Sequence, residues 1–248
     1  MSKIVFITGA TAGIGAASAR RFAGAGWNVI GTGRRRERLD ALTAELGDAF
    51  RPIELDMRDV DGFAATLAGV GEVDLLLNNA GLAPSLTDFQ ESSLDAGLDV
   101  IQTNITGLAA MTRHLLPGLV ARQGAIINLS SVAATYPYRG GAIYGATKAF
   151  VRQFSLDLRS DLHGTGVRVT SIEPGMVETE FTLVRNGGDR EASDTLYADM
   201  NPLTGEDIAE TIFWVATLPP HMNINTLELM PVNQSFAGFA VAREGVKS

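Results

Sequence analysis

The fold is decided by one stretch near the start of the chain, residues 4–15, which read IVFITGATAGIG. An apolar run at 4–8 passes directly into a turn with three glycines, and a helix-like pattern at 14–25 follows. A strand that enters a helix through such a turn is typical of the first half of a βαβ unit. The stretch therefore predicts an α/β fold with a parallel sheet.

The rest of the chain repeats this alternation. Short runs rich in Val, Ile and Leu recur at 28–32, 73–78, 124–130, 167–172 and 224–230. Because these runs are apolar on both faces, they predict strands that are covered on both sides. Helix-like stretches lie between them, at 37–46, 94–121 and 144–162. With no linker or repeat, residues 1–248 are expected to form a single-domain, Rossmann-like, doubly wound parallel sheet with helices on both faces.

One segment departs from the pattern. Residues 176–202 are mixed and polar, with the sequence NGGD at 186–189. An irregular stretch of this length in one domain is typical of a functional lid, although a plain surface excursion is the alternative. We expect a substrate lid here.

Composition excludes several classes of protein. The 248 residues are 46% hydrophobic and 19% charged, which is typical of a folded chain, and the net charge of −8 argues against nucleic-acid binding. The absence of cysteine excludes disulfides, thiolate catalysis and zinc–sulfur sites. No apolar run reaches the length of a membrane span, and the apolar run near Met1 is too short for a signal peptide. We expect a cytoplasmic protein.

The glycine turn has the chemistry of a phosphate site. Gly9, Gly13 and Gly15 let the main chain approach a pyrophosphate, whose charge then lies at the N-terminus of the following helix. The spacing is Gly-x3-Gly-x-Gly, and the alternative is a tight turn without a ligand.

The end of the second strand predicts which dinucleotide binds. An NAD site places a carboxylate there, but this chain has no acidic residue before Glu37. Arg34 and Arg35 would instead bind the 2′-phosphate of NADP, which favours NADP over NAD. We expect Arg36 and Arg38 to face solvent; the alternative is that all four arginines form a solvated helix surface.

Tyr144 and Lys148 are four residues apart and so share one helix face. Lys148 is the sole lysine away from the termini, because 17 of the 20 basic residues are arginine. A cation ~4 Å from the phenol is worth ~4 kcal/mol at an effective dielectric of ~20. That attraction would lower the tyrosine pKa by up to about three, which predicts an acid–base group. An incidental surface pair is the alternative.

Two further polar residues complete a candidate site. Ser131, at the end of a strand, is placed to bond a substrate oxygen, and Asn104 would hold a water that returns a proton to Lys148. The alternative for Asn104 is a buried amide that needs partners. The chain lacks a Gly-x-Ser-x-Gly motif, and His114, His163 and His221 are isolated, so neither acyl transfer nor a metal site is predicted.

These motifs together resemble the short-chain dehydrogenases/reductases. The matching motifs stand in the order of that family across nearly the whole chain: TG-x3-GIG at 8–15, NNAG at 78–81, Asn104, Ser131, Y-x3-K at 144–148 and PG-x3-T at 174–179. The resemblance implies a seven-stranded sheet, a nicotinamide cofactor and an Asn-Ser-Tyr-Lys tetrad. It also implies that Asp56 and Met57 flank the adenine, that Asn79 lies by the ribose, and that the stretch 174–182 lies against the nicotinamide. The remaining cofactor-binding residues that it implies are Thr11, Ala12, Ile14, Ala80 and Gly81 and, within that stretch, Pro174, Gly175, Val177 and Thr179.

A narrower resemblance concerns the substrate. The stretches YGATKAFVRQFS at 144–155, TEF-x3-R at 179–185 and NINTLELMP at 223–231 are similar to the NADP-dependent 3-hydroxy acid dehydrogenases. That branch implies oxidation of L-allo-threonine, L-serine and 3-hydroxyisobutyrate, reduction of malonic semialdehyde, and a homotetramer. Ala12 departs from the pattern, because many NADP-using relatives carry a basic residue there.

A 3-hydroxy acid needs a partner for its carboxylate. The lid offers Arg185 and Arg190, and Arg185 falls in the matched motif; a solvated lid charge is the alternative. The alternatives for the whole protein are a reductase of neutral ketones or other β-oxo compounds, and a non-catalytic NADP sensor on the same fold. The tail 231–248, with Phe236 and Phe239, is a candidate subunit contact.

Overall fold

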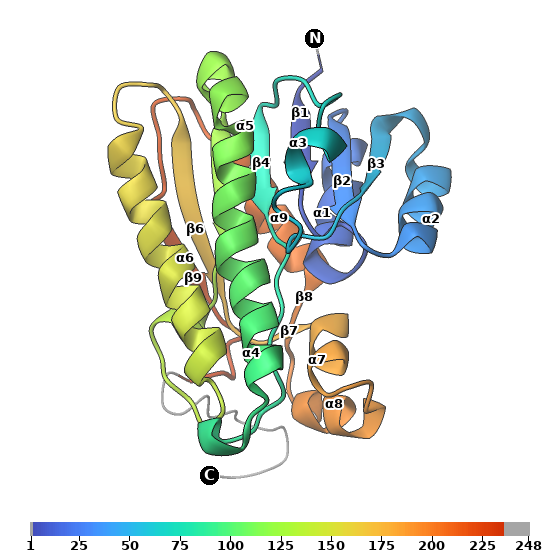
Figure 1. The fold of residues 1–248 in the computed structure, drawn as a ribbon, viewed down its shortest axis with the longest axis vertical. Coiled ribbons are helices and arrows are strands. Elements are labelled where there is room, and N and C mark those ends of the chain that lie inside the picture. The colour runs from blue at the N-terminus through green and yellow to red at the C-terminus, as the bar shows by residue number, and fades with distance from the viewer. Residues whose placement is uncertain (1, 236–248) are drawn as a thin grey trace.

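The computed structural model describes residues 2–235. At its centre is a parallel sheet of seven strands in the order β3-β2-β1-β4-β5-β6-β9 (Figure 1). The strands are β1 (Ile4–Ile7), β2 (Asn28–Gly33), β3 (Phe50–Glu54), β4 (Leu75–Asn78), β5 (Ala125–Leu129), β6 (Arg168–Pro174) and β9 (Thr226–Leu229). The predicted doubly wound α/β sheet is confirmed.

Helices cover both faces of the sheet. One hydrophobic core draws side chains from α1 (Gly13–Gly24), α2 (Arg36–Leu46) and α9 (Gly205–Ala216). The other face carries α3 (Phe63–Thr66), α4 (Leu94–Ile101), α5 (Leu108–Arg122) and α6 (Ala142–Asp161) (Figure 1). Short 3-10 turns lie at η1 (Gly47–Ala49), η2 (Phe89–Glu91) and η4 (Val132–Ala134).

The central strands are buried on both sides. In β1, Val5 and Ile7 belong to one core and Phe6 to the other, and all three have no exposed surface. Successive side chains of a strand point to opposite faces, so a strand between two cores must be apolar at every position. This is the physical reason for the continuous apolar runs in the sequence.

Several elements are absent from the predicted set, among them β3 and α9. Strand β3 lies at the sheet edge, where it pairs only with β2, and it contains Pro52 and the exposed Arg51 and Glu54. An edge strand tolerates proline and polar side chains, so its sequence lacks the apolar signal. Helix α9 begins at a capping box, in which Thr204 and Asp207 bond each other's main-chain N–H.

The long helix predicted at 94–121 is not a uniform α-helix. It consists of α4, a π-helical segment at Gln102–Gly107 and α5. At Gly107 a Cβ atom would lie 2.2 Å from the carbonyl oxygen of Met57, so the helix and the segment after β3 are in close main-chain contact. Asn104 lies within the π-helical turn, the kind of irregularity that often marks a functional position.

The expectation of an irregular segment at 176–202 is wrong. The segment contains β7 (Val177–Glu178), α7 (Glu180–Arg185) and α8 (Arg190–Tyr197), and β7 pairs in parallel with β8 (Leu203–Thr204). Thr179 caps α7 by accepting a hydrogen bond from the N–H of Phe181, and Asp189 caps α8. These helices are too short and too exposed to show an apolar period, which explains the missed prediction.

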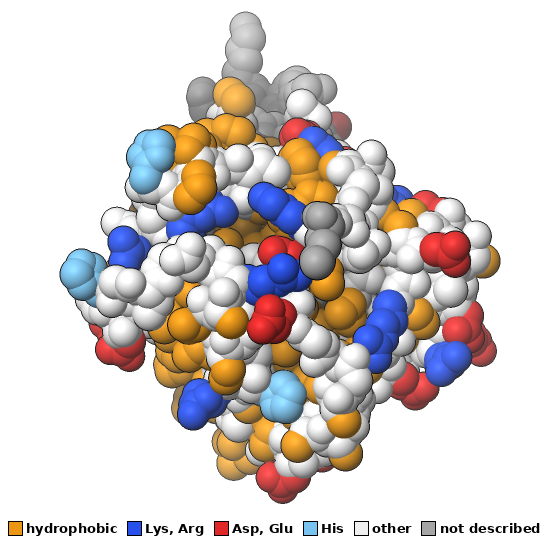
Figure 2. Space-filling model, turned by 90° about the horizontal axis from the view of Figure 1, so that it is seen from above, with side chains coloured by type: hydrophobic (Ala, Val, Ile, Leu, Met, Phe, Trp, Pro, Cys, Tyr) orange, Lys and Arg blue, Asp and Glu red, His pale blue; other side chains and the backbone are white. Residues whose placement is uncertain are grey.

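The outer surface carries both signs of charge. On the face shown in Figure 2, Lys and Arg side chains are interspersed with Asp and Glu, and the histidines visible there lie apart from one another. Within residues 2–235, no helix has the length and apolar content needed to cross a membrane. No three His, Asp or Glu side chains in that range are grouped so that they could hold a metal ion.

Candidate active site

A cavity of about 870 Å³ lies at the carboxyl ends of the central strands, where the chain order of the sheet reverses between β1 and β4. This reversal point is where open α/β sheets bind their ligands. The cavity is lined by nearly all the predicted site residues: Gly9, Thr11, Ala12, Gly13, Ile14, Arg34, Arg35, Asp56, Met57, Asn79, Ala80, Gly81, Ser131, Tyr144, Lys148, Pro174, Gly175, Val177, Thr179 and Arg185. Gly15 and Asn104 are not among the lining residues.

The glycine turn is shaped by main-chain geometry. Gly9 and Gly13 have φ angles of +70° and +51°, which L side chains rarely adopt. At Gly15 a Cβ atom would lie 2.2 Å from the carbonyl oxygen of Gly9 and 2.5 Å from Nδ2 of Asn79. Gly15 thus allows α1 to pack against the strand ends, although it does not itself face the cavity.

The N-terminus of α1 fits an anion. Its cap residue, Ala12, makes no side-chain hydrogen bond to the helix, and the first turn holds no acidic residue. The first N–H groups of a helix have no partner within the helix and carry a partial positive charge. Ala12 and Ile14 line the cavity, so these donors are available to the pyrophosphate of a dinucleotide.

The predicted adenosine end is built after β2 and β3. Arg34 lies 3.9 Å from the carboxylate of Asp56, and Asp56 is bound more closely by Arg58, at 2.7 Å. The hydrogen bonds from Arg58 lower the pKa of Asp56, which keeps this carboxylate ionised. Met57 is buried beside it. The arrangement leaves Arg34, which is half-exposed, free to turn toward a 2′-phosphate.

Arg35 and Arg38 share one carboxylate from the lid. Glu180, the first residue of α7, accepts a hydrogen bond from Arg35 at 3.1 Å and one from Arg38 at 2.5 Å. Arg35 also donates to Oγ1 of Thr11. Arg38 was expected to face solvent; its side chain is 42% exposed and also bonds Glu180, whereas Arg36 pairs on the surface with Asp40. No sequence signal connects Glu180 to arginines more than 140 positions away.

Lys148 is held inside the protein by main-chain contacts. Its Nζ donates to the carbonyl oxygen of Leu129 at 2.7 Å, and its own carbonyl accepts from Oγ of Ser130. These two bonds fix α6 to the end of β5. Burial lowers the pKa of Lys148 to about 8, because an ammonium group loses hydration inside the protein.

The pKa of Tyr144 differs from the expectation. In the protein alone it is raised rather than lowered, because burial disfavours the phenolate and the nearby Tyr138 adds to the effect. A hydrogen bond with Ser131 and the charge of Arg185 oppose the shift. The Lys148 ammonium lies 5.7 Å from the centre of the Tyr144 ring and bonds Leu129, so it does not offset the burial.

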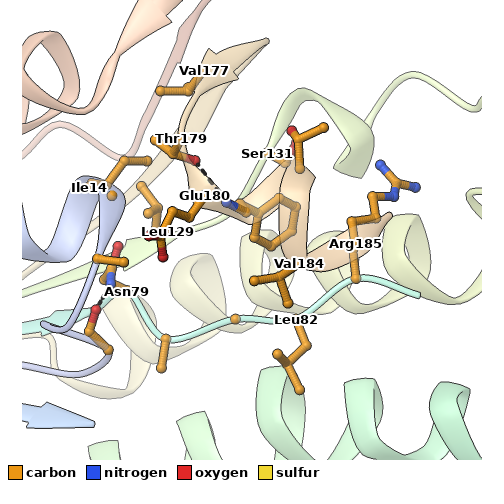
Figure 3. A pocket seen from close by; sticks show the side chains of 18 of the residues that line it. Ile14, Asn79, Leu82, Leu129, Ser131, Val177, Thr179, Glu180, Val184 and Arg185 are labelled. Atoms are coloured by element: carbon orange, nitrogen blue, oxygen red, sulfur yellow. Dashed lines mark hydrogen bonds between the residues drawn. The ribbon is translucent and has the colours of Figure 1, made fainter. Parts of the chain in front are cut away.

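Ser131 lies two residues after β5 and lines the cavity (Figure 3). Its Oγ accepts a hydrogen bond from the N–H of Ala133 and donates a long one, 3.4 Å, to the carbonyl of Pro174. The bond from Ala133 orients the hydroxyl. The weak bond to Pro174 leaves the hydroxyl able to bond another oxygen.

Asn104 acts behind the cavity. Its amide oxygen accepts from the N–H of Leu82, and its amide nitrogen donates to the carbonyl of Leu82 and to Oγ1 of Thr147. Asn104 therefore has the hydrogen-bond partners that a buried amide needs, which was the alternative to a role in proton transfer. Its bonds fix the segment after β4 to α6. Its part in a proton relay stays a prediction.

The lid contributes one positive side chain to the cavity. Arg185 donates to the carbonyl of Pro84 at 3.1 Å and to the hydroxyl of Tyr138 at 3.0 Å. Its guanidinium carbon lies 5.5 Å and 5.7 Å from the ring centres of Tyr138 and Tyr144. Figure 3 shows Val184 and Arg185 leaving α7 in different directions, with Leu82 below Val184. Arg190 does not line the cavity.

Several lining residues were not predicted from the sequence. They include Leu82, Leu86, Tyr138, Arg139, Val184, Leu196 and Tyr197. Most belong to the segment after β4 or to the lid, where no motif marks them. Glu180, Phe181 and Thr182 also line the cavity and fall in the stretch 174–182 that the family resemblance places by the nicotinamide. Phe236 and Phe239, the predicted subunit contact, lie outside the described residues.

Comparison with known proteins agrees with this geometry. The model of the short chain dehydrogenase family matches residues 3–188, three quarters of the chain. The chain belongs to the short-chain dehydrogenase family. The predicted family is thereby confirmed, and with it the single Rossmann-like domain.

Relatives within the short-chain dehydrogenase family are similar over their full length. Serine 3-dehydrogenase of Agrobacterium fabrum is 61% identical, with 98% of this chain and 100% of the relative covered. NADP-dependent 3-hydroxy acid dehydrogenase YdfG of Salmonella typhi is 53% identical, with 97% and 99% covered. The closed form of a serine dehydrogenase complexed with NADP⁺ is 51% identical, with a TM-score of 0.93 and 97% and 100% covered.

Proposed function

We propose that this short-chain dehydrogenase oxidises the C3 hydroxyl of small 3-hydroxy acids, with L-allo-threonine, L-serine, 3-hydroxyisobutyrate and 3-hydroxypropionate as the substrate class. The chain is an NADP-dependent oxidoreductase that acts on a CH–OH group, as predicted. The observation that supports the finer proposal is Arg185, whose guanidinium lies in the same cavity as Tyr144.

The cavity has the groups that NADP needs. The uncapped N-terminus of α1 would hold the pyrophosphate, Arg34 and Arg35 the 2′-phosphate, and Lys148 the nicotinamide ribose. Asp56 and Met57, which line the cavity, would flank the adenine. When it is bound, the cofactor supplies the hydride acceptor for the C3 carbon. Everything else in the reaction is positioning and proton transfer by the chain's own residues.

Tyr144 is the proposed acid–base group. In oxidation its phenolate oxygen takes the proton of the C3 hydroxyl, and Ser131 bonds the same substrate oxygen while its charge changes. Burial keeps the phenol protonated in the protein alone, so oxidation requires cations that lower its pKa. Arg185 is one such cation, and the nicotinamide ring of bound NADP⁺ would be a second.

The carboxylate of a 3-hydroxy acid is two bonds from the reacting carbon, so its partner must lie close to Tyr144. The guanidinium of Arg185 lies 5.7 Å from the centre of the Tyr144 ring, and hydrogen bonds to Pro84 and Tyr138 hold it there. A guanidinium binds a carboxylate with paired, directional hydrogen bonds, and would thereby orient C3.

The test is a spectrophotometric assay that follows the reduced cofactor. NADP⁺ and NAD⁺ are each compared with L-serine, L-allo-threonine, 3-hydroxyisobutyrate, 3-hydroxypropionate and a neutral secondary alcohol. We expect turnover of the acids with NADP⁺ and little with the neutral alcohol. Turnover of the neutral alcohol alone would favour the alternative, a reductase of neutral ketones, and would contradict a carboxylate-binding role for Arg185.

Two further points stay proposals. The residues of the lid, 176–202, would close over the substrate, since Arg185 and Tyr197 reach the cavity from α7 and α8. The family resemblance also implies a homotetramer, and we expect a cytoplasmic protein. Light scattering of the purified protein tests the homotetramer.

A further inference from the structure

The carboxylate of Glu180 occupies an unusual position in a site for a phosphorylated cofactor. Glu180 lines the cavity together with Arg34 and Arg35, and it is bonded to Arg35 and Arg38. The bonds from Arg38 and then Arg35 lower the pKa of Glu180, so it is ionised at neutral pH. A negative group thus neutralises an arginine that faces the position expected for a 2′-phosphate.

We propose that Glu180 is a cofactor-discriminating residue that competes with the 2′-phosphate of NADP for the guanidinium of Arg35. The 2′-phosphate must take Arg35 from Glu180 or share it, while the 2′-hydroxyl of NAD leaves the pair intact. Arg38 does not line the cavity and holds Glu180 from behind. Two arginines therefore share one carboxylate, while Arg34 pairs with Asp56, so Arg35 can turn to a phosphate without leaving Glu180 unpaired.

The same contact joins the cofactor site to the lid. Glu180 is the first residue of α7, and Arg185 is the last. Thr179, the cap of α7, lies against the glycine turn, since a Cβ atom on Gly13 would be 3.1 Å from that of Thr179. A ligand that takes Arg35 from Glu180 removes one of the contacts that hold the start of α7.

The decisive measurement is the dissociation constant of NADP⁺ and of NAD⁺, by calorimetry, for Glu180→Gln. The side chains of Arg35 and Glu180 are 42% and 39% exposed, so water screens the pair and removing the charge of Glu180 should change the dissociation constant only moderately. We expect NADP⁺ to bind about fivefold more tightly, and the dissociation constant of NAD⁺ to change less than about twofold. A change of about fivefold corresponds to the free energy of an exposed ion pair. Glu191→Gln is the matched control, because Glu191 lies in the first turn of α8 and does not line the cavity.

Two results would overturn the proposal. One is weaker NADP⁺ binding by Glu180→Gln, which would mean that the carboxylate orders the arginines and does not compete. The other is an equal or absent change for both cofactors. A thermal melt of each variant verifies folding. Arg38→Gln alone should weaken NADP⁺ binding, because Glu180 would then pair with Arg35 only. The same substitution should have a smaller effect when Glu180 is already Gln, because Arg38 acts through Glu180.

Hydrogen exchange tests the connection to the lid. With saturating cofactor, amides of residues 180–185 should exchange faster in the NADP⁺ complex than in the NAD⁺ complex, and Glu180→Gln should remove the difference. Equal exchange in the wild type would contradict the connection. These measurements concern the cofactor alone, so their failure and the failure of the proposed substrate class are independent.

Discussion

The glycine turn and the lid meet at the same cavity but are stabilised in different ways. Residues 4–15 and α1 are fixed by buried strands and by main-chain contacts too close for a Cβ atom. In the lid, α7 and α8 each bury only one residue, Thr182 and Ser193. The lid is held instead by side-chain contacts of Glu180, Arg185 and Tyr197. The turn can therefore place a cofactor rigidly, while the lid can adjust to a substrate.

The largest expected effect is on the chemical step, at Tyr144 in α6, between the turn and the lid in the sequence. Tyr144→Phe should lower kcat by about a thousandfold, because the proton acceptor is lost. NADP⁺ binding, measured by calorimetry, should stay close to that of the wild type. Tyr136→Phe is the control, since Tyr136 bonds Glu228 and does not line the cavity. An active Tyr144→Phe enzyme would exclude Tyr144 as the acid–base group.

A methyl group added in the glycine turn should destabilise the protein. Gly15→Ala places a Cβ atom 2.2 Å from the carbonyl oxygen of Gly9. We expect the free energy of unfolding to fall by about 3 kcal/mol, as measured by denaturant titration. In the same helix, a Cβ atom on Gly24 would meet nothing within 4 Å, so Gly24→Ala should stabilise by about 0.5–1 kcal/mol. Equal effects at both positions would contradict this packing.

In the lid, substitution should alter substrate affinity and leave the fold intact. Arg185→Met should raise KM for 3-hydroxyisobutyrate by about 10- to 100-fold, the loss expected for a charge-assisted hydrogen bond. KM for a neutral secondary alcohol should change little. Arg190→Met, on the part of the lid that does not line the cavity, is the control. A similar increase for acid and alcohol would refute carboxylate binding by Arg185.

The smallest expected effect is a displacement of the pH profile. The charge of Arg185 lowers the pKa of Tyr144, so Arg185→Met should raise that pKa. Oxidation requires the deprotonated phenol, and a higher pKa leaves less phenolate at any given pH. The rising limb of kcat/KM for oxidation of a neutral alcohol should therefore move to higher pH. A profile that moves to lower pH or stays in place would show that Arg185 does not act on Tyr144.

The same contrast explains which residues could be predicted. Close main-chain contacts and burial on both faces of a strand leave strong signals in the sequence. The three glycines of the turn and the apolar run of β1 are examples. The Tyr144–Lys148 pair was found because four positions equal about one helical turn. The edge strand β3 and the helices of the lid lack an apolar period, and Glu180 meets Arg35 and Arg38 only through the folded chain.

By itself, the sequence determined the alternation of the central strands and helices, the phosphate turn, and the motif residues that line the cavity. These depend on local periodicity and on the absence of a Cβ atom at particular positions, which are properties of short stretches. The tertiary structure decided the direction of the Tyr144 pKa, the partners of Asn104 and the sharing of Glu180 between two arginines. Burial and charge pairing depend on which distant segments lie together, and that is settled only when the chain has folded.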